Sequence, residues 1–370
     1  MEEKIRVLIV DDSALVRKIV ADALESDPSI EVIGTANNGK TAVFKTHTLN
    51  PDVITMDIEM PIMNGLDALR QIIETNPKPV IMMSVLTQHG ADATFRALEL
   101  GAVDFIPKPS TLMSMSVEDI KELLISKVKS VYRSKVKVSR ESTSPASEET
   151  RVPGATGVMG ARPSPIVTST DIRPLEIPMV ASTKKIVGIG TSTGGPSALI
   201  SIFKGFPHNF PAPVLIVQHM PEGFTRAFAE RLDSVSTLNV KEAEDGDKVL
   251  PGCGYLAPGH SHMTIERHSS GDVVRVFKKE KVSGHMPSID VLFSSIAEQC
   301  TPEAVAVIMT GMGRDGADGI LKIRKNGGYT FAQNEETSVV YGMNRVAVEI
   351  GGTFEEVPLL EISKKIVEHL

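Results

Sequence analysis

The first 135 residues alternate five times between a short apolar stretch of strand type and a longer stretch with apolar residues at helical spacing. The strand-type stretches cover residues 5–10, 30–34, 52–57, 80–84 and 104–106, and the helix-type stretches cover residues 15–24, 40–46, 66–73, 91–100 and 117–132. Repeated strand–helix units fold as a parallel sheet with helices on both faces. The alternation therefore predicts a doubly wound α/β domain with a five-stranded parallel sheet over residues 1–135.

Polar residues stand where these predicted strands end. Asp11 and Asp12 follow the first strand, Asp57 ends the third, Ser84 ends the fourth, and Lys108 lies just beyond the fifth. The carboxyl ends of parallel strands share one edge of the sheet, where ligands of such folds bind. Three carboxylates at that edge repel one another unless a cation joins them, and oxygen ligands suit Mg²⁺. We therefore expect a magnesium site there, with Lys108 and Ser84 placed to contact a further anion.

Several short motifs in this region resemble the receiver domain of two-component response regulators. They are Val-Asp-Asp-Ser at residues 10–13, Thr-Met-Asp-Ile-Glu-Met-Pro at 55–61, Asn-Gly at 64–65, Ser84, and Lys-Pro at 108–109. The resemblance implies a flavodoxin-like fold in which Asp57 accepts a phosphoryl group from a histidine kinase. It also implies that Asp11, Asp12 and Asp57 hold Mg²⁺. Ser84 and Lys108 are then expected to contact the phosphoryl group.

Residues 136–183 differ in character from the regions on either side. This stretch is rich in Ser, Thr, Pro, Gly and charged residues, and it lacks any sustained hydrophobic period. Such a composition is typical of a chain that connects domains without a packed core of its own. We therefore expect a flexible linker over residues 136–183.

The composition excludes several classes of protein. The formal net charge is −7 and the chain has no Trp, which argues against a nucleic-acid binder. Cys253 and Cys300 form neither a close metal-binding pair nor a disulfide framework, as expected in a reducing compartment. No signal peptide is visible, and no apolar stretch approaches the ~20 residues of a membrane span. We therefore expect a cytoplasmic protein that neither inserts into a membrane nor binds nucleic acid.

The second half of the chain returns to strand–helix alternation. Strand-type stretches cover residues 185–190, 214–218, 304–310 and 329–333, and helix-type stretches cover 196–204, 223–234, 287–299, 316–326 and 357–369. Between residues 240 and 277 the pattern turns to β, with short candidates at 254–257, 262–266 and 273–277. This order predicts a second doubly wound α/β domain over residues 184–370, with a mainly parallel sheet and an inserted β-hairpin.

A turn of small residues, Gly-Thr-Ser-Thr-Gly-Gly at 190–195, joins the first strand of this half to its first helix. Three interpretations are open. Ser192 can be a nucleophile, because Gly190, Ser192 and Gly194 fit the pattern G-x-S-x-G. The glycines can instead form a phosphate cradle of dinucleotide type. The segment can also be only a tight turn, and the motif alone does not decide among these interpretations.

The ends of two further strands bear on that choice. A dinucleotide fold needs an acidic residue after its second strand to bind the ribose, but the strand at 214–218 ends in Gln218 and His219. A nucleophile needs a base and a carboxylate, and His219 and Asp315 both follow strands that end at the same edge as Ser192. Their order along the chain is Ser, His, Asp, whereas α/β-hydrolases have Ser, Asp, His. The residues therefore favour a serine hydrolase built on a different scaffold.

The same residues belong to motifs that resemble the catalytic domain of chemotaxis protein-glutamate methylesterases. The motifs are Ser-Thr-Gly-Gly at 192–195, Gln-His-Met-Pro at 218–221, Ala-Pro-Gly at 257–259, His-Met at 262–263, His-Met-Pro-Ser-Ile-Asp-Val-Leu-Phe at 285–293, and Thr-Gly-Met-Gly-Arg-Asp-Gly at 310–316. The order of receiver, linker and esterase also matches that family over nearly the whole chain. The resemblance implies that Ser192 is the nucleophile, His219 the general base and acid, and Asp315 the residue that orients His219. It further implies an oxyanion hole made by the backbone N–H groups of Thr193 and Met312.

The resemblance also implies partners and a mode of control. The expected substrates are methyl esters of glutamates on chemoreceptors, with deamidation of certain glutamines, and the phosphoryl donor is the chemotaxis histidine kinase. No metal or other cofactor is expected in the esterase half. Our hypothesis for control is steric: the unphosphorylated receiver packs across the Ser192 edge, and phosphorylation of Asp57 loosens that contact.

Some alternatives remain at this stage. A DNA-binding response regulator is disfavoured, because no basic recognition helix is visible and the output half is long. A non-catalytic adaptor that docks on receptors is disfavoured by the complete set of Ser192, His219 and Asp315. The His-Ser-His sequence at 260–262 lacks a nearby third ligand for a metal. His262 and His285 either line the substrate cleft or are structural.

Overall fold

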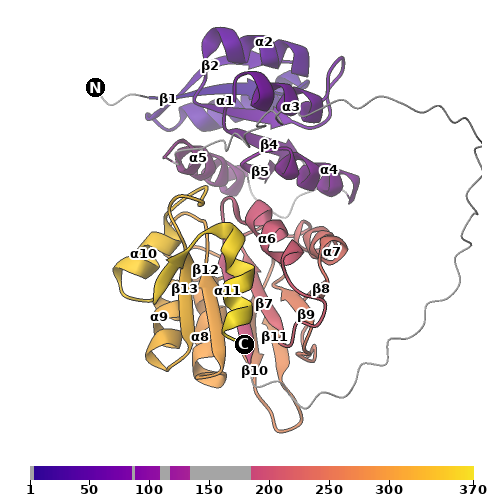
Figure 1. Ribbon diagram of the computed structural model, residues 1–370. Helices are drawn as coiled ribbons and strands as arrows, with labels where there is room; N and C mark the ends of the chain where they lie inside the picture. Colours follow the sequence, from indigo (N-terminus) through magenta and orange to yellow (C-terminus); the bar gives the residue numbers. More distant parts are fainter. Residues whose placement is uncertain (1–3, 86–87, 109–116, 134–184) are drawn as a thin grey trace, which may run out of the picture. The chain divides into compact units, whose positions relative to one another are not determined.

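The computed structural model describes residues 4–85, 88–108, 117–133 and 185–370 of the chain (Figure 1). A five-stranded parallel sheet forms the N-terminal part. The strands follow the order β2-β1-β3-β4-β5. They are β1 (Ile5–Val10), β2 (Ile30–Ala36), β3 (Val53–Asp57), β4 (Val80–Ser84) and β5 (Asp104–Pro107). The helices between and after them are α1 (Ala14–Glu25), α2 (Gly39–Leu49), α3 (Gly65–Thr75), α4 (Gln88–Glu99) and α5 (Val117–Arg133). The predicted fold class is confirmed for this half.

The apolar run of β1 shows why both faces of this sheet need helices. Alternate side chains of a strand point to opposite faces. Val7 and Ile9 belong to the cluster that includes residues of α1 and α5, whereas Leu8 and Val10 belong to the cluster that includes residues of α2 and α3. A run without polar residues is therefore what a central strand of a doubly wound sheet requires.

Each of the first three helices starts at a side-chain cap that the sequence supplies. The side chains of Ser13, Asn38 and Asn64 accept hydrogen bonds from the backbone N–H three residues further along. These caps satisfy N–H groups that the helix itself leaves free. Because each cap lies just beyond a strand or its following loop, it also fixes the carboxyl edge of the sheet.

The second half contains a seven-stranded sheet whose pairs are all parallel, in the order β14-β13-β12-β6-β7-β9-β8. Its strands are β6 (Ile186–Thr191), β7 (Val214–Gln218), β8 (Asn239–Glu242), β9 (Cys253–Leu256), β12 (Ala304–Ile308), β13 (Tyr329–Gln333) and β14 (Glu355–Val357). The accompanying helices are α6 (Gly195–Lys204), α7 (Thr225–Val235), α8 (Ile289–Gln299), α9 (Ala317–Lys325), α10 (Met343–Glu349), η1 (Leu359–Glu361) and α11 (Ile362–Glu368). The expectation of a mainly parallel sheet is confirmed.

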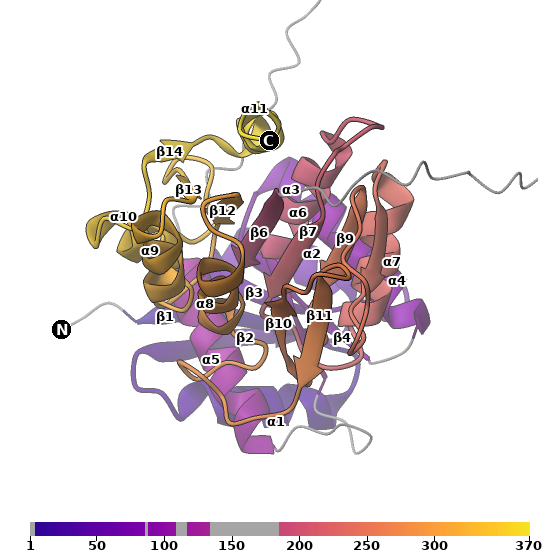
Figure 2. The same cartoon turned by 90° about the horizontal axis from the view of Figure 1, so that it is seen from below.

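The predicted hairpin is present as a separate unit. Strands β10 (His262–Glu266) and β11 (Val273–Phe277) pair antiparallel in a two-stranded sheet of their own. β10 packs against α8, which follows β11 in the chain (Figure 2). The segment expected at 254–257 joins the large sheet instead, as the parallel strand β9. The hairpin therefore supports the start of α8 rather than widening the main sheet.

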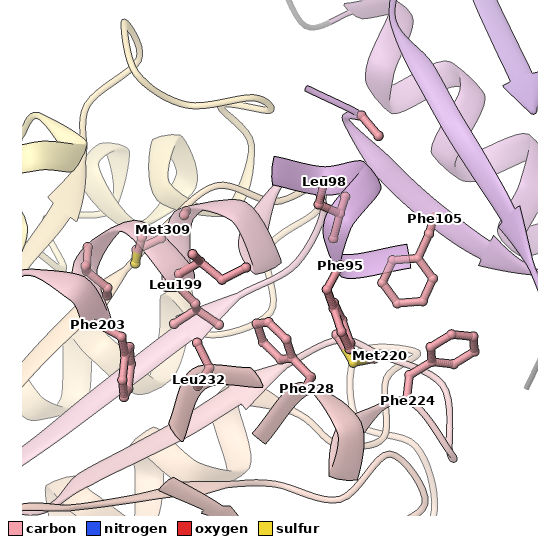
Figure 3. Close-up of a cluster of buried hydrophobic side chains, with 14 of the residues drawn as sticks. Phe95, Leu98, Phe105, Leu199, Phe203, Met220, Phe224, Phe228, Leu232 and Met309 are labelled. Atoms are coloured by element: carbon pink, nitrogen blue, oxygen red, sulfur yellow. The ribbon is translucent and has the colours of Figure 1, made fainter. Parts of the chain in front are cut away.

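A cluster of aromatic side chains joins residues that lie before and after the linker segment (Figure 3). Phe95 of α4 lies 5.1 Å from Phe228 of α7, centroid to centroid, and Phe105 of β5 lies 4.7 Å from Phe224. All four rings are buried. Contacts of this kind place the two sheets in one compact unit, while the predicted linker at 136–183 lies outside the described residues.

Two further observations concern the classes of protein that the composition argued against. Within the described ranges, no helix is both long enough and apolar enough to cross a membrane. Both cysteines are free, and burial raises the pKa of the Cys300 thiol to about 12. A thiol of that kind stays protonated and unreactive near neutral pH.

Candidate functional site

Ser192 lies at the carboxyl end of β6, in the tight turn that leads into α6. The left-handed residue of this turn is Gly194, with φ 78°, while Ser192 itself does not have a positive φ. The turn therefore differs from a nucleophile elbow, in which the serine carries the strain. A Cβ atom at Gly194 would lie 2.5 Å from Val339 Cβ, and one at Gly195 would lie 2.0 Å from Gln218 Oε1. Both glycines are therefore required by close packing around Ser192.

Gln218, the last residue of β7, ties this turn to the next strand. Its amide nitrogen donates to the backbone oxygens of Ser192 and His219, at 2.9 Å each. Its amide oxygen accepts from the Thr191 hydroxyl at 2.5 Å. One buried side chain thus fixes the backbone of two of the predicted catalytic residues relative to each other.

His219 lies between Ser192 and Asp315, as the strand ends predict. Its Nδ1 is 3.2 Å from Ser192 Oγ, and its Nε2 is 2.8 Å from Asp315 Oδ2. A carboxylate only accepts hydrogen bonds, so Nε2 carries the proton and Nδ1 is left to accept from the Ser192 hydroxyl. The side chains of His219 and Asp315 are 9% and 1% exposed, so the pair is shielded from solvent.

The start of α8 holds the Asp315 carboxylate. Oδ1 accepts from the Ser288 hydroxyl at 2.8 Å and from the Asp290 N–H at 3.2 Å, and Oδ2 accepts from the Ile289 N–H at 2.7 Å. Burial alone would raise the pKa of Asp315, but these hydrogen bonds and the interaction with His219 lower it to about 2. Asp315 is therefore ionised at neutral pH and has a fixed orientation toward His219.

Two further histidines surround this arrangement, and the structure gives each a place. His262 is buried; its Nδ1 accepts from the Ser288 N–H at 3.2 Å, and its Nε2 lies 3.0 Å from the Glu280 carbonyl. It therefore supports the loop that leads into α8 and has no nitrogen free for a metal. The His285 ring stacks on His219 at 3.8 Å, centroid to centroid. Burial and the neighbouring His219 lower the pKa of His285 to about 4, so it is neutral at pH 7.

Of the two residues expected to form an oxyanion hole, Thr193 follows Ser192 in the chain and Met312 follows Gly311. Thr193 is buried, and its carbonyl accepts from the Thr310 hydroxyl at 2.8 Å. The backbone of Gly311 approaches Ser192 so closely that a Cβ at Gly311 would lie 2.7 Å from Ser192 Cβ. Met312 follows directly and is partly exposed. Among the described residues, the N–H groups of Thr193 and Met312 donate to no protein acceptor.

A second polar site lies at the carboxyl edge of the first sheet. Oxygens of Asp11, Asp12 and Asp57 lie within 4.8 Å of one another. Lys108 Nζ is 2.7 Å from Asp57 Oδ2 and 3.0 Å from Asp11 Oδ2. Burial raises the pKa of Asp57 to about 6, although Lys108 acts in the opposite direction. The lysine therefore compensates the buried charge only in part.

This acidic cluster fits a hard cation. Oδ2 of Asp11 and of Asp57 is buried, and within the described part of the chain the Lys108 ammonium is its only partner. Carboxylate oxygens are the donors that Mg²⁺ prefers. Ser84 lies at the end of β4 as predicted, but its hydroxyl donates toward the Gly90 carbonyl, 3.1 Å away, rather than toward Asp57.

The two halves together define a response-regulator receiver joined to an esterase domain. Residues 7–117 match the family model of the response regulator receiver domain, and residues 187–366 match that of the CheB methylesterase. The chain belongs to the CheB methylesterase family, as the resemblance predicted, and is a hydrolase. The match over 187–366 leaves no room for the DNA-binding output module considered as an alternative.

Curated relatives cover nearly the whole chain. The protein-glutamate methylesterase/protein-glutamine glutaminase of Pyrococcus horikoshii is 44% identical over 377 residues, covering 100% of this chain and 94% of that protein. The protein of the same name from Halalkalibacterium halodurans is 45% identical, covering 94% and 93%. The crystal structure of the Thermotoga maritima CheB methylesterase catalytic domain is 42% identical with a TM-score of 0.50, and covers 52% of this chain and 100% of that one.

Proposed function

We propose that this chain hydrolyses methyl esters of glutamate side chains on chemoreceptors, releasing methanol, and deamidates certain glutamines of the same receptors. The observation that carries this proposal is the continuous hydrogen-bonded series from Ser192 through His219 to Asp315. Such a series gives a hydroxyl a base near neutrality and gives the base a fixed orientation. The full-length relatives carry names for this pair of activities.

The proposed chemistry follows from the atoms that face each other. Ser192 Oγ attacks the ester carbonyl carbon while His219 Nδ1 takes the hydroxyl proton. His219 then gives this proton to the departing methoxy oxygen, which leaves as methanol, or to the amide nitrogen of a glutamine, which leaves as ammonia. Water then gives a proton to His219 and attacks the acyl-enzyme, and His219 returns this proton to Ser192 Oγ as the glutamate carboxylate is released. Asp315 remains ionised throughout and stabilises the imidazolium.

Charge develops on the substrate carbonyl oxygen in both steps. We propose the N–H groups of Thr193, which follows Ser192, and of Met312, which follows Gly311, as the donors that stabilise it. A fixed donor of this kind typically contributes about 3–4 kcal/mol to the transition state. Because Ser192 lies beside the start of α6, the helix dipole acts in the same direction.

In the first half, we propose that Asp57 accepts a phosphoryl group from a histidine kinase. Asp11, Asp12 and Asp57 would hold Mg²⁺, which neutralises the charge of the incoming phosphoryl group. Lys108 and Ser84 would contact the phosphoryl oxygens. Ser84 must then break its bond with the Gly90 carbonyl, so phosphorylation changes a hydrogen bond at the start of α4.

Control would act through the same elements. Phe105 lies on β5 three residues before Lys108 and contacts Phe224, which immediately precedes α7. Val339, whose loop packs against Gly194 beside Ser192, also contacts the core cluster formed by receiver residues. The receiver thus touches both sides of the proposed catalytic edge. We propose that the unphosphorylated receiver obstructs receptor access and that phosphorylation weakens this obstruction.

The proposal extends to organisation and location. We propose a receiver at residues 1–135, a linker at 136–183 and a catalytic domain at 184–370, with the protein acting in the cytoplasm. The cytoplasmic location follows from the proposed partners, since a histidine kinase and the methylated helices of chemoreceptors both lie in that compartment.

Methanol release from purified, methylated chemoreceptor fragments tests the chemistry. Ser192→Ala is expected to lower kcat roughly 10⁴- to 10⁶-fold, as loss of a triad nucleophile does elsewhere. Ser201→Ala is the matched control, because this hydroxyl lies on α6 and, among the residues that the structure describes, bonds only to the Ser197 carbonyl. Undiminished activity of Ser192→Ala would reject the assignment. Equal rates with and without acetyl phosphate would reject the proposed regulation by phosphorylation but would not contradict the proposed hydrolysis.

A further inference from the structure

Asp290 in α8 binds the N-terminus of α9, and Asp315, which precedes α9, binds the N-terminus of α8. Asp315 immediately precedes Gly316, the N-cap residue of α9, and its carboxylate accepts the N–H groups of Ile289 and Asp290 in the first turn of α8. In return, Asp290 Oδ1 accepts the N–H of Gly319, in the first turn of α9, at 2.7 Å. The two helices are thus capped reciprocally, each by a carboxylate from the other's segment.

This exchange replaces a cap that α9 lacks. The N-cap residue of α9 is Gly316, which has no side chain to accept from the free N–H groups of the first turn. Asp290 supplies the missing acceptor from the neighbouring helix. Its position also suits the positive end of the α9 dipole.

The approach of the two helices leaves little freedom for either carboxylate. A Cβ atom at Gly319 would lie 2.6 Å from Phe293 Cβ and 3.2 Å from Asp290 Oδ1. Only glycine therefore fits where α9 crosses α8. Since Asp315 stands at the start of α9, a shift of that helix start moves the carboxylate that orients His219.

We propose that Asp290 is a positioning residue for the esterase reaction: by capping α9, it holds Asp315 at hydrogen-bond distance from His219. This inference rests on the proposed function of the Ser192, His219 and Asp315 set. It assigns a role to a side chain that, among the described residues, makes no hydrogen bond or ion pair with Ser192 or His219.

The electrostatic surroundings agree with this role. Burial raises the pKa of Asp290 to about 6; the Gly319 N–H acts against this shift, and the nearby carboxylates of Asp315 and Asp318 add to it. Asp318 is itself paired with Arg314 at 2.8 Å. Burial and the two neighbouring carboxylates make the ionised form of Asp290 unfavourable. Such perturbed groups are common at functional sites, where the position of the side chain matters for another residue.

Methanol release from a methylated receptor fragment by the full-length chain provides the first test. Asp290→Ala is expected to lower kcat about 10- to 100-fold with KM little changed, because misplacing an orienting group acts on the chemical step. Asp290→Asn keeps an oxygen that accepts from Gly319 and is expected to recover most of the loss. Asp318→Ala is the matched control, since it removes an exposed acid from the first turn of α9, the turn that Asp290 caps from α8. A kcat of Asp290→Ala equal to that of Asp318→Ala would overturn the proposal.

Two further measurements separate positioning from general destabilisation. If Asp290 acts through Asp315, Asp290→Ala in an Asp315→Ala background is expected to lower kcat no further. An undiminished additional loss would overturn the proposal. The proton on His219 Nε2 should give a low-field NMR resonance that broadens or shifts in Asp290→Ala but not in Asp318→Ala, and an unchanged resonance would also contradict the inference. This signal needs no ester substrate, so it is independent of whether Ser192→Ala abolishes methanol release, which tests the proposed function itself.

Discussion

Asp57 and Asp315 are both buried aspartates at the carboxyl edge of a parallel sheet, yet their pKa values shift in opposite directions. The pKa of Asp57 is raised to about 6, and that of Asp315 is lowered to about 2. Burial acts upward on both. The difference comes from what each carboxylate receives in return: Asp315 accepts from His219, Ser288 and two backbone N–H groups, whereas Asp57 has Lys108 and a single long bond from the Glu59 N–H.

The contrast separates two ways of building a reactive edge. The Asp315 site is electrostatically complete, so it is organised before any substrate arrives. The Asp57 site is incomplete, because its buried carboxylates outnumber the positive charges near them. Such a site gains most from a cation and from a change of covalent state, as a switch requires. The same residue type therefore serves as a fixed support in one sheet and as a switch in the other.

Asp315→Asn is expected to give the largest effect, because it changes the fully hydrogen-bonded carboxylate of the Asp315 site. An amide can present its N–H to His219 Nε2, which favours the tautomer with a proton on Nδ1, facing Ser192. The base is then already protonated, and kcat is expected to fall about 10³- to 10⁴-fold, as for the equivalent change in serine proteases. Measured kcat and KM for methanol release, with thermal unfolding as a check on folding, test this. A loss confined to KM would show that Asp315 serves substrate binding instead.

Asp57→Asn probes the Asp57 site, where the buried negative charge is only partly compensated. The substitution is expected to stabilise the fold at neutral pH. The folded pKa of about 6 lies above the ordinary value of 3.8, so the folded state favours the protonated form. This contribution is fully present below about pH 4 and is lost as the pH rises through 6. At pH 7.5 without Mg²⁺, the substitution should therefore raise the free energy of unfolding by about 1–3 kcal/mol, and the gain should shrink toward pH 4.5.

Urea unfolding at a series of pH values measures this difference. Asp67→Asn is the control, since Asp67 is exposed and pairs with Arg70 on the surface of α3. Added Mg²⁺ should stabilise the wild type and narrow its gap to Asp57→Asn. A pH-independent gain, or one shared by Asp67→Asn, would mean that the charge of Asp57 is not strained in the fold.

The positions of both sites could largely be predicted from the sequence, because the carboxyl edge of each sheet follows from the ends of its predicted strands. Buried apolar runs located most of the central strands, and the residue after each run then lies at a known edge. The strands β8 and β14 and the helix α10 were missed, since segments of three to seven residues are too short to show a clear hydrophobic period.

The supports of the two sites were harder to predict. Ser288 and His262 reach Asp315 and the start of α8 by bonds that join residues 26 or 27 positions apart, and such bonds leave no spacing pattern. One usable signal existed, because a serine before a helical run is a common N-cap. The direction of the Ser84 hydroxyl could not be predicted, since a strand end fixes the residue but not its rotamer.

Glu99→Ala is expected to give the smallest effect, and it tests how the two sites are connected. Glu99 of α4 pairs with Arg231 of α7 at 2.5 Å and lies 3.9 Å from Lys204 of α6. Ion pairs of this exposure contribute about 0.2–1 kcal/mol and weaken with salt. Losing this pair should therefore raise the methanol release of the unphosphorylated protein about 1.5- to 5-fold, with no change once Asp57 is phosphorylated.

The matched control is Glu122→Ala, an exposed acid of α5 in the same receiver. Added salt should raise the wild-type rate toward that of Glu99→Ala and should change the variant less. If both variants behave alike, the obstruction depends on net charge rather than on this contact. If Glu99→Ala instead lowers the rate, the contact between α4 and α7 supports the active site. The receiver would then stabilise the Asp315 site rather than obstruct it. In that case the Asp315 site would not be organised independently of the receiver that carries the Asp57 switch.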